Sequence, residues 1–179
     1  MTDTKISAMS SATDLSGATI PIVQGAANKK ADMSLFDNRY TQGTWALIGT
    51  LTTTSGSTQA QALGGTYKEL RIVLNGVSGA SASTLRVAIS DDSASTYGSA
   101  IAISAAMGSA ANVLSGMLSI FNTGLTGTKY VLAFTVSNAP EVFAGGGSEA
   151  SKTGVTTHIR FSWASGNFDA GSISIYGLT

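Results

Sequence analysis

The sequence predicts a mainly-β protein with two parts: an extended N-terminal arm over residues 1–42 and an antiparallel β-sandwich, jelly-roll-like, over residues 43–179. Three observations favour this fold class. The first forty residues show little hydrophobic periodicity. From Trp45 onward, apolar residues alternate with polar ones in short runs, which is typical of strands that bury one face. Gly, Ser, Asn and Asp separate these runs at regular spacing, as in sandwiches and jelly rolls.

Within the arm, residues 20–23 can form one short extended segment. Pro21 has no amide N–H, so we expect this segment at a sheet edge or on another surface. Residues 31–40 can form one or two helical turns, with Asp32 as the N-cap. An arm of this composition buries too little apolar surface to offset its chain entropy, so we expect another surface to order it.

About eight strands are expected in the second part. The runs span residues 45–51, 67–76, 84–90, 100–104, 113–121, 129–136, 157–164 and 171–177. The stretch 102–116 is rich in alanine, but Gly108 and its serines disfavour a helix there. The sequence beyond the arm therefore predicts strands joined by polar connections.

Each run is expected to place its apolar residues on one face, which is then buried. The sets that share a face are Leu70, Ile72 and Leu74; Leu85, Val87 and Ile89; Tyr130, Leu132, Phe134 and Val136; Ile159, Phe161 and Trp163; and Ile173 and Ile175. Trp45 and Trp163 both lie in strand patterns, so we expect both in the core.

Three connections are candidates for flexible loops: residues 78–83, 90–99 and 144–154. The last is long and polar, and begins close to three consecutive glycines. Such a loop is either a mobile tip or is ordered by a partner. It superficially resembles a phosphate-binding loop, but Ser151 stands where the Walker motif needs a glycine before Lys152.

The charge balance limits the classes of partner. Ten Lys and Arg balance ten Asp and Glu, so the formal net charge is zero. Nucleic-acid binding needs clustered cations, so no nucleic-acid partner is expected. Only 11% of the residues are charged, against roughly 25% in typical soluble domains. A neutral surface of Ser, Thr, Asn and Gly suits a chain that functions inside a larger assembly.

Cysteine usage and hydropathy exclude further classes. The chain has no cysteine, so disulfides and thiolate metal sites are excluded. No apolar run approaches the roughly 18 residues that cross a bilayer, so no membrane insertion is expected. The first residues, MTDTK, precede no apolar segment, so we expect no secretory signal and synthesis in a cytoplasm.

The chemistry-bearing residues favour a non-enzymatic protein without cofactors. The single histidine, His158, is expected on the solvent side of its strand, opposite Ile159. Asp91 and Asp92 are adjacent, so on a regular strand they would point in opposite directions. They lie in a turn-rich stretch, where Asp is expected to cap backbone amides, and they make only a weak calcium loop. The sequence therefore predicts no catalytic and no metal-ligating residues.

Residues 5–30, KISAMSSATDLSGATIPIVQGAANKK, carry an ordered set of small, apolar and basic residues. The stretch resembles an N-terminal module of tailed-bacteriophage virion proteins, tail fibres especially. The usual form runs Ile-Ser-x-Leu-Pro-x-Ala-Thr-x-Leu-Thr-Gly, then an apolar triplet with Pro-Val-Val-Gln-Gly-Gly, then a short gap and Lys-Lys. The matching residues are Ile6, Ser7, Ala12, Thr13, Leu15, Gly17, Pro21, Val23, Gln24, Gly25, Lys29 and Lys30. The chain departs from this form at Met9, Ser10, Ser16, Ile22 and Ala26.

The resemblance implies a role for the arm, because in the resembled proteins the module lies near the virion-proximal end. The virion-anchoring residues that it implies are Ile6, Leu15, Pro21, Val23, Gln24, Gly25, Lys29 and Lys30. The implied partners are other virion proteins of the capsid, portal or tail, and further copies of this chain, with a trimer favoured. The two lysines can pair with acidic groups on those partners. The implied location is the exterior of the particle, after synthesis in the host cytoplasm.

Three functions stay open. The first is a short fibre, spike or receptor-binding subunit that presents the sandwich to the host surface. The second is a capsid or tail decoration or cement protein with no receptor. The third is a depolymerase of surface glycan, for which no carboxylate pair is evident. For the first, Tyr97 and Phe143 lie outside the alternating faces and are candidate contacts with a host glycan; alternatively, each closes one end of the sandwich as a core residue.

Overall fold

The computed structural model describes residues 19–24, 27–32, 43–107, 110–139 and 141–179. The chain divides into two compact units, Met1–Gln42 and Gly43–Thr179. The regular secondary structure of the described residues is entirely β-strand, so the mainly-β prediction is confirmed. Within these residues, the chain forms no helix of the length and hydropathy that a membrane crossing requires.

In the first unit, β1 (Thr19–Gln24) and β2 (Ala27–Asp32) form an antiparallel pair. The extended segment predicted around Pro21 is therefore confirmed, with a partner strand that the sequence analysis did not predict. Pro21 lies opposite Lys30. A two-stranded ribbon tolerates proline because each of its strands has one edge with no neighbour. Asp32, predicted to cap a helix, ends β2 instead, and residues 33–40 of that prediction lie outside the described residues.

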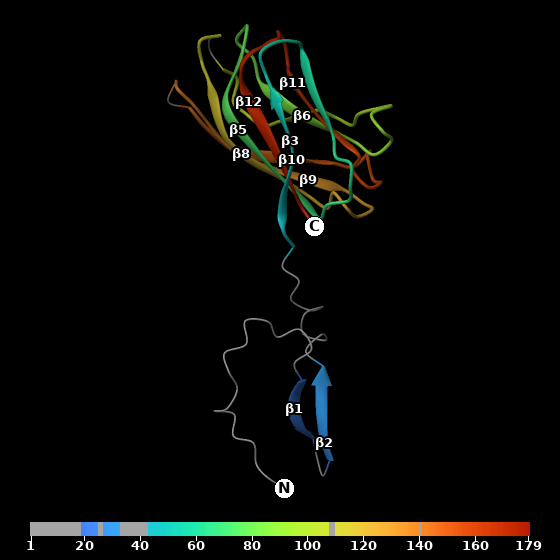
Figure 1. Ribbon diagram of the computed structural model, residues 1–179. Helices are drawn as coiled ribbons and strands as arrows, with labels where there is room; N and C mark the ends of the chain where they lie inside the picture. The colour runs from blue at the N-terminus through green and yellow to red at the C-terminus, as the bar shows by residue number, and fades with distance from the viewer. Residues whose placement is uncertain (1–18, 25–26, 33–42, 108–109, 140) are drawn as a thin grey trace. The chain divides into compact units, whose positions relative to one another are not determined.

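The second unit is a sandwich of two antiparallel sheets, drawn in Figure 1. The six-stranded sheet has the order β10 (Val142–Glu149), β9 (Lys129–Ser137), β8 (Leu114–Phe121), β5 (Glu69–Gly79), β12 (Phe168–Leu178) and β3 (Trp45–Thr52). The four-stranded sheet has the order β4 (Thr58–Ala62), β11 (His158–Trp163), β6 (Leu85–Ser90) and β7 (Ile101–Ala102). Strands β8, β9 and β10 are consecutive neighbours, whereas most other connections cross between the sheets.

The core lies between the two sheets and is built from alternate residues of their strands. Four of the five predicted faces are confirmed as buried: Leu70, Ile72 and Leu74; Leu85, Val87 and Ile89; Ile159, Phe161 and Trp163; and Ile173 and Ile175. Burying one such side chain contributes about 1.5–3 kcal/mol. Trp163 also packs against Phe168, with ring centroids 5.9 Å apart. These contacts hold the two sheets together.

Strand β9 faces the opposite way from the prediction. Its larger apolar residues, Tyr130, Leu132, Phe134 and Val136, are exposed, and the residues between them are buried. The register with β8 explains this, because it places Val131 beside Ile120 and Ala133 beside Leu118 on the buried face. Since those β8 side chains already fill the core, the smaller residues of β9 fit inside and the larger ones point out.

The prediction that Trp45 is a core residue is also wrong, since its side chain is 37% exposed. The cause is a β-bulge in the pairing of β3 with β12. Gly49 pairs with Ile175 but Leu47 pairs with Tyr176, so Ile48 is the extra residue. Ile48 packs against the core, and the bulge turns the residues before it to the outer face.

Two strands of the second unit were not predicted. Strand β4 is polar in sequence, TQAQA, and forms an edge of the four-stranded sheet. Strand β10 occupies residues that were predicted to be a flexible loop, so that prediction is wrong for residues 144–149. The backbone ladder with β9 needs no side chains, and Gly145 leaves room for the Phe143 ring. A Cβ at Gly145 would lie 2.7 Å from that ring.

Candidate functional site

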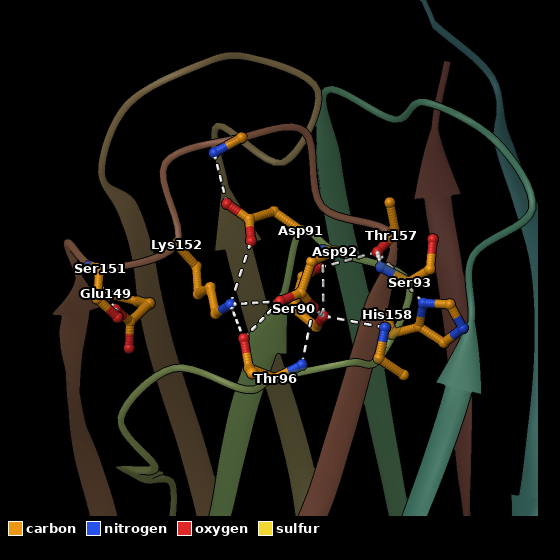
Figure 2. Close-up of polar contacts among 12 residues, drawn as sticks. Ser90, Asp91, Asp92, Ser93, Thr96, Glu149, Ser151, Lys152, Thr157 and His158 are labelled. Atoms are coloured by element: carbon orange, nitrogen blue, oxygen red, sulfur yellow. Dashed lines mark hydrogen bonds and ion pairs between the residues drawn. The ribbon is translucent and has the colours of Figure 1, made fainter.

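Two carboxylates and one amine meet at one end of the sandwich, where the loop after β6 approaches the loop after β10. Lys152 Nζ lies 2.9 Å from Asp92 Oδ2 and 3.4 Å from Asp91 Oδ1. Figure 2 shows the Lys152 amine pointing toward both carboxylates and toward the Thr96 hydroxyl. The positive charge of Lys152 therefore offsets the repulsion between the two adjacent aspartates.

Asp92 organises the turn that follows β6. Ser90 Oγ donates to Asp92 Oδ1 at 2.6 Å, and the Thr96 amide donates to the same oxygen at 2.9 Å. These hydrogen bonds from Ser90 and Thr96, with that from Lys152, hold the pKa of Asp92 well below its usual range. The prediction that this aspartate caps backbone amides is confirmed.

Asp91 ties the second loop to the first. The Gly154 amide donates to Asp91 Oδ2 at 2.8 Å, and this loop also supplies Lys152. The hydrogen bond to Asp92, followed by that to Asp91, raises the pKa of Lys152. Contacts within the chain thus hold Lys152 and Gly154. The two alternatives for this part of the loop, a mobile tip and ordering by a partner, stay predictions.

A second pair of charged residues, Lys129 and Glu149, lies at the open end of the hairpin that β9 and β10 form. Lys129 is fully buried, and its amine donates to Leu125 O at 2.5 Å and Gly127 O at 2.9 Å. Burial lowers the pKa of Lys129, and Asp91 acts against that shift. Glu149 is buried opposite Lys129 in the register. Burial opposes its ionisation, but hydrogen bonds from Ser151 and from the Ser99 and Lys152 amides together lower its pKa. Both groups hold loops in place.

His158 lies near this end of the sandwich, beside a hydroxyl that makes other hydrogen bonds. Its Nδ1 is 3.2 Å from Thr157 Oγ1. That hydroxyl is oriented by other bonds, because it accepts from the Ser93 amide at 3.0 Å and donates to Ser90 O at 3.3 Å. His158 is half-buried while Ile159 is fully buried, as predicted. In the described part of the chain, no three His, Cys, Asp or Glu residues lie where they could together hold a metal ion.

The largest unusual feature is the outer side of the six-stranded sheet. We call it the outer apolar face and define it by ten exposed residues: Trp45, Leu47, Val73, Met117, Phe121, Tyr130, Leu132, Phe134, Val136 and Val142. The strand pairings align these residues in rows across the sheet. The described chain exposes only three other large hydrophobic residues, Val113, Leu125 and Val155, so exposure is concentrated on one surface. Contiguous apolar patches of this kind mark interaction sites.

On the outer apolar face, a line of large side chains on β9 lies beside small residues on β10. The paired positions are Phe134–Ala144, Leu132–Gly146 and Tyr130–Ser148. Because β10 is an edge strand, these small residues lie along the border of the sheet.

Charge on this face is sparse and internally matched. Arg71 lies 3.8 Å from Glu69, and its guanidinium stacks over Trp45, with Cζ 4.3 Å from the ring centroid. Arg71 is therefore held by its own chain on two sides. The face therefore offers apolar area but carries no net charge, so it does not complement a strongly charged partner.

The two predicted receptor contacts lie apart from the outer apolar face. Tyr97 is half-buried, and Arg160 stacks over its ring at 4.1 Å from the centroid. Phe143 is partly buried and packs against the core. Its position agrees with the alternative in which it closes the sandwich. A glycan contact at either residue stays a prediction.

The predicted anchoring residues are only partly within the described residues. Pro21, Val23 and Gln24 lie in β1, and Lys29 and Lys30 lie in β2. The hairpin pairs Pro21 with Lys30 and places Lys29 opposite Ile22. Ile6, Leu15 and Gly25 lie outside the described residues. The anchoring role of all eight stays a prediction.

The outer apolar face was not predicted from the sequence, although a signal for it is present. Strands β8 and β9 carry apolar residues at both odd and even positions. In β8, Leu118 and Ile120 point into the core while Met117 and Phe121 point outward. Strands that are apolar on both faces are typical of sheets that are covered on both sides. Applied to residues 113–136, this rule indicates a sheet that needs a cover.

Comparison with models of protein families gave no match, and comparison with curated proteins gave none. Among solved structures, the chain is similar to an exo-inulinase from Aspergillus awamori, at 14% sequence identity and a TM-score of 0.33. The similarity covers 90% of this chain and 34% of that chain, so this chain spans about a third of that structure's length. A similarity at this level carries no argument about activity or substrate.

Proposed function

We propose that the chain is a structural subunit of a tailed phage or phage-like particle. Its N-terminal arm anchors it, and its sandwich is presented outward as a short fibre, spike or receptor-binding head. The observation that carries the proposal is the outer apolar face, because a sheet face of this kind suits a subunit that contacts other proteins in an assembly. The phage-like module over residues 5–30 supports the choice of particle through the order and spacing of its residues.

A decoration or cement protein is the second candidate, and one observation favours it. The two aromatic residues expected at a receptor, Tyr97 and Phe143, are engaged by Arg160 and by the core. A cement subunit needs only surfaces that bind its neighbours. Copy number separates the candidates: a cement subunit covers the shell in many copies, whereas a receptor-binding protein is present in few copies and binds host cells.

Particle incorporation tests the proposal. The full chain and a chain lacking residues 1–30 are each produced during particle assembly, and purified particles are analysed by quantitative mass spectrometry. We expect the full chain at a fixed copy number. We expect the truncated chain to be absent, although its sandwich unfolds at the same temperature, because the anchor is lost while the core is unchanged.

Charge reversal refines this test. In the full chain, Lys29→Glu with Lys30→Glu is expected to reduce incorporation at least tenfold if the lysines pair with acidic groups on the particle. Lys68→Glu, at an exposed lysine of the sandwich, is the matched control and should incorporate normally. Absence of the full chain from particles contradicts the proposed function. Normal incorporation of the truncated chain shows that the anchor lies elsewhere.

A further inference from the structure

We propose that the outer apolar face of the six-stranded sheet binds another copy of this chain. The proposal goes beyond the particle and the arm, because it names the surface of the sandwich that is covered and the molecule that covers it. It does not rest on the proposed function, since self-association through a sheet face can occur with or without a particle.

The amount of apolar surface fits a stable contact. Phe134 is 54% exposed and Leu132 is 44% exposed, and both lie on β9, beside the edge strand β10. Side chains of this size that are about half exposed leave roughly 80 Å² each in contact with water. The ten residues of the outer apolar face together offer roughly 800 Å², which is one partner's share of a standard protein interface.

The charge of the face favours a copy of itself as the partner. Its one close ion pair joins Arg71 to Glu69 of the same chain, at 3.8 Å. A strongly charged partner would find no complementary group here. A second copy brings the same apolar residues and the same matched pair, so no unpaired charge is buried when the two faces meet.

The shape of the face also suits a copy of itself. The large side chains of β9, from Tyr130 to Val136, lie next to small residues of β10, which are Ala144, Gly146 and Ser148. A surface of this kind can pair with itself, because the large side chains of one copy can pack on the small residues of the next. A two-fold pair and a closed three-fold ring both satisfy this arrangement.

The neighbours of the exposed aromatic rings disfavour a glycan or a lipid surface. Met117, Leu132 and Val136 surround Phe134 through the pairing of β8 with β9, and none of the three can hydrogen-bond to sugar hydroxyls. Sugar sites need polar groups placed around the ring. An anionic lipid surface attracts clustered Lys and Arg, whereas the single arginine of this face is already paired.

The test measures the mass of the full chain in solution by sedimentation equilibrium, from about 1 to 100 µM, where interfaces of this size commonly associate. We expect a dimer or a trimer. Leu132→Glu combined with Phe134→Glu should weaken association on the order of 100-fold, because two carboxylates would be buried without partners. Both positions are exposed in the single chain, so the unfolding midpoint of the dissociated variant should match that of the dissociated parent.

A matched pair of substitutions on the other sheet controls for added charge. Ala60→Glu with Ala62→Glu places two carboxylates at exposed positions of β4 and should leave association unchanged. If the charged variant of the outer apolar face does not fold, Leu132→Thr with Phe134→Thr keeps residues that suit strands and should still weaken association about tenfold.

Three results would overturn the proposal. One is a full chain that stays monomeric up to about 100 µM. Another is a folded variant of the outer apolar face that associates as tightly as the parent. The third is dissociation caused equally by the β4 variant. A monomeric chain that instead binds phosphatidylcholine vesicles or a host polysaccharide through Phe134 would assign the face to that other partner.

Discussion

The outer sides of the two sheets differ in how they are covered. On the four-stranded sheet, Ala88 of β6 points outward in the strand alternation, yet it is only 2% exposed. Its neighbour on β11 is Arg160, whose guanidinium stacks over Tyr97 from the loop after β6. On the six-stranded sheet, Phe134 keeps half of its surface in water.

This difference shows which outer side is covered by side chains of its own chain and which one exposes large apolar residues. A short loop and one cation–π pair suffice to cover Ala88, because its side chain is small. The six-stranded sheet is wider, and its outward residues are large. Within the second unit, the large apolar residues on that side are exposed. The proposal above assigns their cover to a second copy of the chain.

The largest difference in stability is expected between a charge placed at an inward position of β9 and the same charge placed at an outward position. Val131→Asp places a carboxylate at a position that is 4% exposed, and we expect unfolding or a loss of about 4 kcal/mol or more, because the charge is buried without a partner. Leu132→Asp, one residue along, should change the stability of the single chain by less than about 1 kcal/mol. Urea unfolding of both variants at low protein concentration measures this difference. Equal losses would contradict the orientation of β9.

A smaller effect is expected from uncovering the four-stranded sheet. Tyr97→Ala removes the ring under Arg160, and we expect a loss of about 1–2 kcal/mol from the cation–π contact and the lost burial. Tyr130→Ala, on the outer apolar face, is the matched control and should have almost no effect on the single chain. Thermal unfolding at low concentration compares the two. A stability loss at Tyr130 as large as that at Tyr97 would show that both sheets are covered by their own chain.

The smallest change in stability is expected at acid pH, from protonation of Asp92 in the loop that carries Tyr97. The folded-state pKa of Asp92 lies below its ordinary value of 3.8, so the ionised carboxylate favours the folded chain. This contribution is complete above the ordinary pKa and is lost as the pH falls through and below it. The unfolding midpoint in urea should therefore fall between about pH 5 and pH 2, and less steeply in Asp92→Asn. Identical slopes for the parent and Asp92→Asn would contradict the role of the Asp92 hydrogen bonds.

The class of fold could be predicted because alternation of apolar residues depends only on the geometry of a strand. On β5, three large residues, Leu70, Ile72 and Leu74, share one face, against Val73 alone among charged and polar residues on the other. On β11 the face opposite Ile159 and Phe161 carries no aliphatic residue, so the orientation of both strands is clear. Asp91 and Asp92 were interpreted correctly as turn residues for a similar reason: short acidic side chains beside serines bond to nearby amides.

The failures share a physical cause, which is dependence on a neighbouring strand. In β9 both faces are apolar, so the register with β8 decides which of them is buried. The orientation of Trp45 depends on a bulge that exists only in the pairing of β3 with β12. Strand β10 has three glycines and no strong pattern, and it is ordered by the ladder that β9 provides. The outer apolar face was missed with them, because its rows arise only once β8 and β9 are aligned.

The place of β12 in the six-stranded sheet has a consequence for the timing of folding. Strand β12 lies between β5 and β3, and its residue Leu178 pairs with Trp45, at the start of the sandwich. Strand β3 has no other neighbour in that sheet. During synthesis on the ribosome, β3 therefore stays unpaired in this sheet until β12 has been made. Only a chain synthesised through β12 can form the complete six-stranded sheet.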